Sequence, residues 1–510
     1  MKRGGSPDTG AVVDRFATGR GFAAVLVAYI VLHFALRLAL SPTIGVDDVA
    51  ETIFAQSLQW TYYARQPPLY TWLLWATFHV FGVGVVSVAL LKYALVAAGY
   101  VCFWLSACRI FPDRRLALLA VLSMSLIYAV GYGVHVGFTN TVLLFAACGA
   151  TLYALLLVVE RGGVADYLAL GAALGVGLLS KWGYAVFAAP LVLAAMFQEA
   201  SRRRLADPRM IATFAVVAVL VGPFLVFGFQ GGAMIGVFTG TMRAGGRASY
   251  LAGVGSGLGT LVVAVSMFLA PLWLFAVTVF PKALRAPPRA AGGFDARRLF
   301  EHFFLVVAGV LLLGVFVAGI THFKSRWMHP ALIAFPLYFF CLVRDAGFSP
   351  RQLRAWAALV AVAAAAVIGA RLAQDLVGPP FCGKCRLLKP YPELARVIES
   401  QGFSGGTIVA GDEHIAGNFR AVFPESRAAT SAYPFYIPPV PAESGGQCLV
   451  VWDQREGDSI PLGLRQFLQT GFGAEPGFAP IQTIDAPYRR GDPRRLTLDF
   501  IRLPGTGRCR

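Results

Sequence analysis

The chain has 510 residues, of which 57% are hydrophobic and only 14% are charged, and its mean hydropathy is +0.64. A soluble domain carries about a quarter charged residues, so this composition excludes an ordinary soluble protein and indicates a polytopic membrane protein. The net charge of +17 would suit nucleic acid, but Lys and Arg cluster in short loops between apolar segments. That pattern is typical of membrane orientation, and we expect no nucleic-acid partner.

The N-terminal segment predicts an uncleaved first transmembrane helix. Residues 1–20 are polar and end in a basic flank, and the apolar run that follows has no small-residue cleavage site. Apolar runs compatible with membrane spans of roughly 20 residues predict about eleven crossings. These runs lie near 21–40, 84–107, 116–132, 139–159, 167–180, 184–198, 210–230, 254–280, 302–320, 328–343 and 355–374.

The loops between these runs alternate in charge. One set, which includes 109–115 and 202–209, is rich in Arg and Lys, whereas the other set is poor in both. By the positive-inside rule the rich loops are cytoplasmic, and the N-terminus therefore lies inside. The loop at 45–75 then faces outward.

The composition changes from about residue 374 onward. Gly, Pro and charged residues rise, and the apolar runs shorten to strand length at 406–411, 448–453 and 496–503. Helix-like segments lie at 392–403 and near 459–472. This alternation predicts a small α/β domain, and an odd number of crossings places it outside. We therefore expect three parts: a cytoplasmic N-terminus at 1–20, an all-α transmembrane domain at 21–374 and an extracytoplasmic α/β domain at 375–510.

Four of the eight cysteines lie in this C-terminal part, namely Cys382, Cys385, Cys448 and Cys509. An oxidising compartment would allow them to form disulfides, whose pairing the sequence leaves open. Cys382-Gly-Lys-Cys385 could also be a zinc half-site or a redox pair. It lacks a second cysteine pair or a histidine cluster at ligand spacing, and no thioredoxin-like context surrounds it, so a structural disulfide is favoured.

The outward loops supply a small acidic cluster and a larger basic one. Their ionisable and polar residues are Asp47, Asp48, Glu51, Arg65, Gln66, His135, Asn140, Lys181, Arg243, Arg247, Tyr250, His322, Lys324, Arg326 and His329. Arg and Lys supply charge-assisted hydrogen bonds to phosphate oxygens, so a lipid-linked phosphate would need such a basic set. A nearby carboxylate could accept the proton of an attacking hydroxyl. Together they suit transfer of a sugar from a lipid phosphate, where the leaving group gains negative charge.

Several of these residues have structural alternatives. Asp47 and Asp48 could cap the helix that follows, and capping does not exclude catalysis. Lys324 and Arg326 could extend from the end of a span toward the interface. His329, like His322, is more often a structural histidine than a ligand.

Aromatic residues and one buried lysine also have two interpretations. Trp60, Tyr62 and Tyr63 are typical of the interfacial aromatic belt, although they could also stack on a sugar. Lys92 lies deep within an apolar run and needs a partner, because an ionisable group at bilayer depth is costly.

Three motifs resemble those of the membrane-embedded GT-C glycosyltransferases of glycosyltransferase family 39, over roughly residues 20–375. The first is Asp47-Asp48, followed by Gln56 to Trp60 and then by Gln66-Pro67-Pro68-Leu69. The second is Ser180-Lys181-Trp182-Gly183, and the third runs from Lys324 to Pro330. The family includes lipid A aminoarabinose transferases, bacterial galacturonosyl transferases and protein O-mannosyltransferases.

The resemblance implies a polyprenyl-phosphate sugar donor, an outward active site in the bacterial inner membrane, and inversion at the anomeric carbon. It implies that Asp47 is the catalytic aspartate, with Asp48 as its acidic neighbour, and that lipid A or lipopolysaccharide core is the acceptor. We expect Lys181, Lys324 and Arg326 to hold the donor phosphate, assisted by Arg65, Arg243 or Arg247.

Two departures from the family pattern matter. Arg65-Gln66 replaces the acidic or His/Lys pair that commonly precedes the prolines, and Asn140 stands where a second-loop Asp is common. Both weaken any metal site, although a divalent cation stays possible, and they favour a lipid-linked sugar other than aminoarabinose.

Two other functions are compatible with a polytopic membrane protein of this composition. A transporter or lipid flippase would place ionisable residues near the midplane, often in repeated halves, whereas here the charges concentrate at the outer interface. A catalytically inactive homologue with an assembly role is the second alternative, because the substitutions leave fewer carboxylates than usual.

Overall fold

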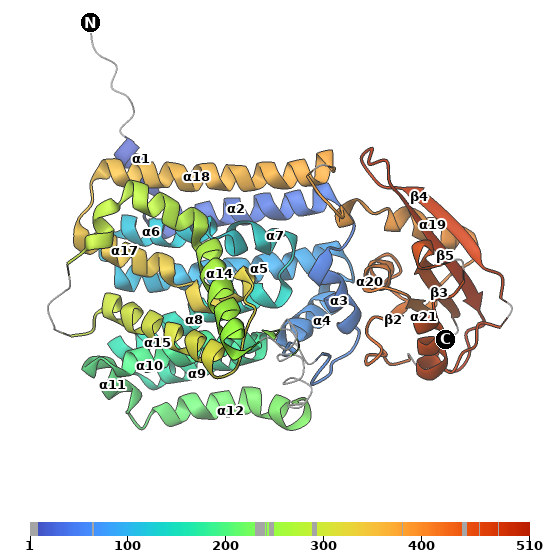
Figure 1. Cartoon of the computed structure of the whole chain (residues 1–510), viewed down its shortest axis with the longest axis horizontal. Helices are drawn as coiled ribbons and strands as arrows, with labels where there is room; N and C mark the ends of the chain where they lie inside the picture. The colour runs from blue at the N-terminus through green and yellow to red at the C-terminus, as the bar shows by residue number, and fades with distance from the viewer. Residues whose placement is uncertain are drawn as a thin grey trace, which may run out of the picture.

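A computed structural model describes residues 9–63, 66–229, 240, 242–243, 249–287, 293–379, 381–440, 446–457, 459–477 and 479–510. The long helices lie roughly parallel, and a sheet domain sits at one end of their bundle (Figure 1). The N-terminal helix α1 (Thr9–Phe16) lies toward the opposite end. The predicted helical membrane domain and small α/β domain are therefore both present.

Within the described ranges, seven helices are long and apolar enough to cross a membrane. They are α2 (Gly19–Leu40), α5 (Val85–Ile110), α8 (Thr139–Glu160), α12 (Met210–Phe227), α14 (Tyr250–Val279), α15 (Ala296–Phe316) and α18 (Pro350–Leu372), which continues as a π-turn to Val377.

Three further apolar segments are bent pairs rather than straight helices. These pairs are Arg114–Leu126 with Ala129–Val136 (74°), Trp182–Met196 with Glu199–Leu205 (115°) and Ser325–Leu332 with Phe335–Ala346 (55°). The helices within them are α6 (Arg114–Leu122), α7 (Val134–Val136), α10 (Ala185–Met196), α11 (Glu199–Leu205), α16 (His329–Leu332) and α17 (Phe335–Ala346). With the shorter apolar helix α9 (Val164–Ser180), a helical segment lies at each of the eleven predicted apolar runs. In the described part of the chain, seven of these segments are long and apolar enough to cross a membrane, or up to ten if each bent pair is one span.

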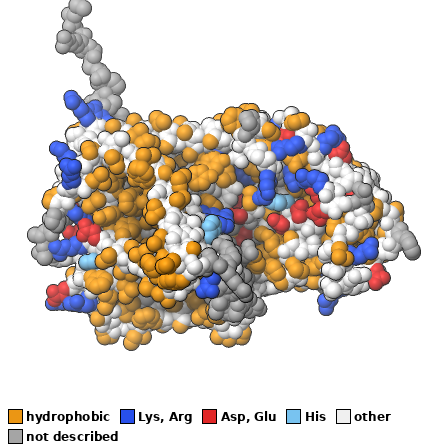
Figure 2. All heavy atoms as spheres, viewed as in Figure 1, with side chains coloured by type: hydrophobic (Ala, Val, Ile, Leu, Met, Phe, Trp, Pro, Cys, Tyr) orange, Lys and Arg blue, Asp and Glu red, His pale blue; other side chains and the backbone are white. Residues whose placement is uncertain are grey.

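The helices differ in how much of their surface other helices cover. In α8 83% of the most apolar window is buried, whereas the shares in α12 and α14 are 22% and 28%. Helix α8 packs against α5 and α9 in the middle of the bundle. Hydrophobic side chains cover much of the bundle surface, and charged ones gather at its two ends (Figure 2). The uncovered apolar helix faces are those that lipid contacts in a multi-pass membrane protein.

The C-terminal domain is built on a five-stranded mixed sheet with the strand order β2-β1-β3-β5-β4. Strand β1 pairs in parallel with β2 and β3, whereas β5 pairs antiparallel with β3 and β4. The strands are β1 (Gly406–Ala410), β2 (Arg427–Thr430), β3 (Gln447–Asp453), β4 (Gln482–Pro487) and β5 (Arg495–Leu503). The predicted strands correspond to β1, β3 and β5, whereas β2 and β4 were not predicted.

Helices cover both faces of this sheet. Successive side chains of the central strands point to opposite faces, so each face carries apolar side chains for a helix to pack against. Ile408 and Leu449 belong to one apolar cluster with α19 (Tyr391–Ser400) and α20 (Glu413–Val422). Val409 and Val450 belong to a second cluster with α21 (Leu462–Phe467). Helices α19 and α21 match the predicted helical segments, whereas α20 connects β1 to β2 and was not predicted.

The C-terminal cysteines form two disulfides, Cys382–Cys385 and Cys448–Cys509, so the structural disulfides that the sequence favours are confirmed. The second disulfide ties β3 to the end of the chain. Cys102, Cys108, Cys148 and Cys341 are free.

The sheet domain rests directly on α3 (Val46–Phe54), the helix that begins the loop between the first two predicted spans. A Cβ atom on Gly417 of α20 would lie 2.6 Å from the Val49 carbonyl oxygen, so only glycine permits this approach. Asn418 accepts a hydrogen bond from the Ile44 backbone N–H at 2.7 Å. Gln56 makes two hydrogen bonds with the backbone of Ala428 on β2, at 2.7 and 2.8 Å. These contacts hold α3 between the bundle and the sheet.

Candidate active site

Helix α3 presents three carboxylates, with Asp47 and Asp48 in its first turn and Glu51 in its second. Acidic side chains are favoured in the first turn because its unpaired backbone N–H groups carry partial positive charge. Successive helical residues point about 100° apart at 3.6 residues per turn, so Asp47 and Asp48 cannot share one environment. The structure gives each of the three acids a different partner.

Asp47 is partly buried and is held by the backbone of the loop that precedes α8. Its Oδ2 accepts a hydrogen bond from the Phe138 N–H at 3.0 Å. Phe138 has a left-handed backbone conformation, with φ of 64°, immediately before α8. Its ring covers Gly133, where a Cβ atom would lie only 2.2 Å from the ring. Gly133 therefore permits the conformation that directs the Phe138 N–H at Asp47.

Asp48 is buried and forms an ion pair with Lys92 of α5, with Nζ and Oδ2 2.8 Å apart. Asp48 is therefore the partner that the sequence led us to expect for Lys92. The other oxygen of the carboxylate, Oδ1, is buried without a hydrogen-bond partner among the described atoms. The Asp48 carboxylate thus links α3 to α5 through this ion pair.

Glu51 is buried and accepts two hydrogen bonds, from the Thr71 hydroxyl at 2.6 Å and from the Asn140 side-chain amide at 2.8 Å. Burial raises the pKa of the Glu51 carboxyl to about 7, although the hydrogen bonds from Thr71 and Asn140 act in the opposite direction. Asp47 and Asp48 add to the increase. Glu51 therefore binds a proton far more readily than an exposed glutamate does.

Lys181 lies in the link between α9 and the short 3-10 helix at Trp182–Tyr184, where it donates a hydrogen bond to the Thr141 hydroxyl at 2.9 Å. Burial lowers the pKa of its ammonium group to about 8, Asp47 opposes that change, and Arg326 adds to it. These electrostatic effects require Asp47 and Arg326 to lie near Lys181. The structure thus brings together three residues that are far apart in the sequence.

The remaining predicted site residues have other surroundings. Arg243 is exposed and donates two hydrogen bonds to the Ala318 carbonyl, at 3.2 and 2.8 Å. Lys324 is exposed, with its ammonium group 5.5 Å from the centre of the Trp327 ring. His329 is fully buried near Lys181, and neither of its ring nitrogens has a hydrogen-bond partner among the described residues.

The predicted residues of the first loop are used in packing. Tyr62 is buried, and its hydroxyl donates to the Ser57 carbonyl at 2.5 Å and accepts from the Gln59 N–H at 2.9 Å. Gln66 is half-buried, and its backbone forms a β-bridge with Tyr63. Arg65 and Arg247 lie outside the described residues.

Sequence reasoning missed Thr71, Phe138 and Thr141, which hold Glu51, Asp47 and Lys181. Thr141 directly follows Asn140, which the sequence did indicate as a site residue. That adjacency was the signal that could have identified Thr141. No signal identified Phe138, because it contributes only its backbone N–H. In the part of the chain that the structure describes, no group of three or more His, Cys, Asp or Glu side chains could hold a metal ion.

Comparisons with known proteins agree with this architecture. The family model described as dolichyl-phosphate-mannose-protein mannosyltransferase matches residues 65–227. The lipopolysaccharide core galacturonosyltransferase RgtB of Rhizobium johnstonii is 31% identical over 489 residues, which cover 94% of this chain and 97% of that protein. RgtA of the same organism, which carries the same description, is 30% identical over 436 residues, covering 84% of this chain and 85% of that protein.

The crystal structure of ArnT from Cupriavidus metallidurans bound to undecaprenyl phosphate matches with a TM-score of 0.59. The match covers 94% of this chain and 98% of ArnT at 15% identity, so it shows the shared fold. The relatives that resemble this chain over almost its full length are glycosyltransferases, which favours an enzyme over the transporter alternative. This chain belongs to the GT-C membrane glycosyltransferases, in the family that includes the lipopolysaccharide core galacturonosyltransferases.

Proposed function

We propose that this glycosyltransferase moves a sugar from a polyprenyl-phosphate donor to lipopolysaccharide core or lipid A at the outer face of the bacterial inner membrane. RgtA and RgtB, which are described as lipopolysaccharide core galacturonosyltransferases, support this acceptor, and the undecaprenyl phosphate bound to ArnT supports a lipid-linked donor. The same relatives favour galacturonate as the sugar. In this orientation the N-terminus is cytoplasmic, and residues 375–510 form a periplasmic domain.

One observation supports Asp47 as the catalytic residue among the three acids of α3. Asp48 and Glu51 are buried and have side-chain partners, whereas Asp47 is only partly buried. The single hydrogen bond to its carboxylate comes from a backbone N–H to Oδ2, and Oδ1 has no partner among the described residues. Asp47 is therefore the acid of this helix that can accept a proton from a bound substrate.

The proposed reaction is a single displacement at the anomeric carbon. Asp47 takes the proton from an acceptor hydroxyl as the oxygen of that hydroxyl forms a bond to the anomeric carbon. The bond between that carbon and the phosphate oxygen breaks, and polyprenyl phosphate leaves with the electron pair. Attack on the face opposite the leaving group inverts the configuration. Lys181 and Arg326 stabilise the negative charge that develops on the phosphate.

The buried acids contribute to position rather than to proton transfer. Asp48 joins α3 to α5 through Lys92, and Glu51 joins α3 to α4 (Leu69–Phe81) and α8 through Thr71 and Asn140. These links fix the helix from which Asp47 extends. A substrate group placed 1 Å away from its productive position can cost about 100-fold in rate, which gives such links functional value.

The test is Asp47→Asn, which keeps the size of the side chain and an oxygen that can accept the Phe138 N–H. A general base contributes about 100- to 10,000-fold, so transfer should fall by at least about 100-fold while the protein still folds and inserts. Asp14→Asn, at an exposed residue of α1, is the matched control and should transfer normally. The readout is incorporation of sugar from a polyprenyl-phosphate donor into lipopolysaccharide extracted from a deletion strain.

Near-normal turnover by Asp47→Asn would remove Asp47 from the mechanism. The lipopolysaccharide of the deletion strain tests the function itself, because an active transferase predicts the loss of one defined sugar mass. Unchanged lipopolysaccharide would instead support the inactive-homologue alternative.

A further inference from the structure

A cavity of about 470 Å³ lies where the bundle meets the sheet domain. One wall comes from the bundle, from Tyr128 and Tyr132 beside the bend after α6 and from Gln374 at the end of α18. A second wall is the segment that contains the Cys382–Cys385 disulfide. Val46 at the start of α3 completes the lining next to Asp47. The cavity is large enough for a small part of a ligand, such as one or two sugar residues.

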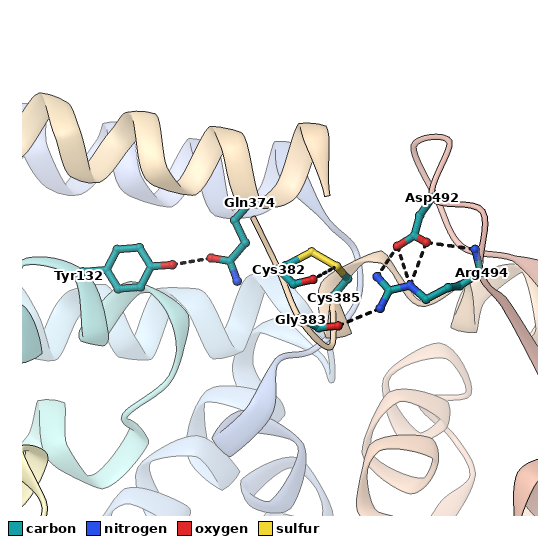
Figure 3. Close-up of a disulfide and its surroundings, with 7 residues drawn as sticks. All are labelled: Tyr132, Gln374, Cys382, Gly383, Cys385, Asp492 and Arg494. Atoms are coloured by element: carbon teal, nitrogen blue, oxygen red, sulfur yellow. Dashed lines mark hydrogen bonds and ion pairs between the residues drawn. A yellow bond between two sulfur atoms is a disulfide. The ribbon is translucent and has the colours of Figure 1, made fainter. Parts of the chain in front are cut away.

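The two walls are held in place before any ligand binds. The Tyr132 hydroxyl donates to Gln374 Oε1 at 2.5 Å, which joins the two parts of the bundle wall (Figure 3). On the other side, Arg494 donates to the Gly383 carbonyl at 2.9 Å and pairs with Asp492, which ties the disulfide loop to the sheet domain. A preformed site loses less free energy in ordering its walls when a ligand binds.

The lining is both aromatic and cationic. Tyr128 on the bundle wall and Phe381 beside the disulfide are 58% and 61% exposed, which leaves aromatic surface available on both walls. Lys384 is exposed and Arg386 is half-exposed on the disulfide loop. The pKa of nearby His414 is lowered to about 4 by burial and by the charges of Arg386, Lys389 and Lys384, which shows that these cations gather in one place.

One carboxylate, that of Asp375, is also among the described lining residues. It is buried, and the charges of Arg371, Arg37 and Arg490 all act on it. The described lining therefore holds two cations, Lys384 and Arg386, against this one carboxylate, and its net charge is positive. Such a lining suits an anionic ligand that also has apolar or ring-shaped parts.

Asp47 itself is not among the described lining residues, but residues close in the chain to Asp47 and to its hydrogen-bond partner are. Val46 precedes Asp47 in the chain, and Val136 lies two residues before Phe138, whose N–H binds Asp47. Lys181 and Arg326 are not among the described lining residues. A Cβ atom on Gly137, the residue after Val136, would lie 3.5 Å from Asp47 Oδ2, so the acid adjoins the cavity lining.

We infer that this cavity binds the anionic saccharide part of the acceptor glycolipid, with Lys384 and Arg386 pairing with its carboxylate or phosphate groups. The inference rests on the proposed function for the identity of the acceptor. Tyr128 and Tyr132 offer ring faces for sugars on the side of the bundle. Binding here brings an acceptor hydroxyl to Asp47 while the donor occupies the Lys181 side.

The test is the charge reversal Lys384→Glu/Arg386→Glu, with Lys384→Ala/Arg386→Ala as a milder second variant. The matched control is Arg396→Glu/Arg465→Glu, which makes the same change in net charge at exposed residues of α19 and α21. Two readouts are measured. The first is binding of fluorescently labelled lipopolysaccharide from the deletion strain to the purified protein, and the second is the KM for acceptor and for donor in transfer.

We expect the charge reversal to weaken lipopolysaccharide binding and raise the acceptor KM by at least about 10-fold, or roughly 1.4 kcal/mol. The alanine variant should show a smaller change in the same direction, and the donor KM should change by less than about 2-fold. The difference from wild type should shrink at high salt, because ions screen exposed charges. The control should match the wild type in both readouts.

Unchanged lipopolysaccharide binding by the charge-reversed protein would overturn the inference, as would an increase in the donor KM in place of the acceptor KM. A wild type that binds lipopolysaccharide through these cations but transfers no sugar would contradict the proposed function and leave the binding site standing. A wild type that transfers sugar while the reversal has no effect would contradict only the cavity assignment.

Discussion

Replacing Lys92 by Met tests how firmly the acid-bearing helix is attached to the bundle. Lys92 and Asp48 form a buried ion pair, with 4% and 3% of their surfaces exposed, and link α5 to α3. Methionine keeps much of the length and volume of lysine but has no charge. The substitution leaves the Asp48 carboxylate buried, and its Oδ1 already has no partner among the described atoms.

The size of the effect follows from the cost of a buried, uncompensated charge. Removing one partner of a buried pair typically costs about 3–5 kcal/mol, whereas replacing both partners by neutral groups can be close to neutral. Lys92→Met should therefore lower the free energy of unfolding by about 3–5 kcal/mol. The double variant Lys92→Met/Asp48→Asn should recover at least about 2 kcal/mol of that loss, because neither side chain of the pair is then charged.

The assay is unfolding by denaturant in mixed micelles, followed by tryptophan fluorescence, for the wild type, both single variants and the double variant. Transfer activity is measured in parallel, because a displaced α3 moves Asp47, and the double variant should transfer faster than Lys92→Met. If the double variant loses as much free energy as the two single variants together, the two side chains act independently and the ion pair does not hold α3.

Two further predictions concern the contacts of α3 and the charge beside it. Gly417→Ala places a Cβ atom 2.6 Å from the Val49 carbonyl oxygen and should destabilise the domain contact by about 1–3 kcal/mol. The measurement is limited proteolysis, with Gly463→Ala as the control because a Cβ atom there meets open space. We expect Gly417→Ala to be cleaved faster than this control. Because the pKa of Lys181 is lowered to about 8, its charge is present below that pH and is lost above it, so the donor KM should rise as pH passes 8. In Lys181→Arg, which stays charged, that rise should be absent; an identical rise there would assign the titration to another group.

The sequence predicted the outward loop, its acids and the membrane-spanning segments because each rests on a local pattern. Lys92 needed a partner on general grounds, since a charge deep in an apolar run is costly. The identity of that partner was beyond a single sequence, because Asp48 lies 44 positions away and three acids in the same loop were equally available. The roles of these acids differ because Lys92 of α5 pairs with Asp48 and Asn140 of α8 binds Glu51, and a single sequence does not show these contacts.

The C-terminal domain was predicted where its strands are long apolar runs and missed where they are not. Strand β2 has only four residues, Arg427–Thr430, and begins with an arginine, although all four are buried. Strand β4 lies at the sheet edge, where only Ile484 of its six residues is buried. Helix α20 contains Gly417 and Asn418, both unfavourable in a helix by propensity, and both are explained only by contact with the first loop.

That contact means that the sheet domain and the first loop are one structural unit. Ile53 and Phe54 of α3 belong to the same apolar cluster as Ile408 of β1 and Phe419 of α20. The composition changes near residue 374, yet the core of the region beyond it includes residues 320 or more positions earlier in the chain. Because Asp47 stands at the start of this shared helix, its position depends on the bundle through Lys92 and on the sheet domain through Gly417. Without the sheet domain α3 would lose its packing against β1 and α20, so this domain helps to hold the proposed catalytic acid in place.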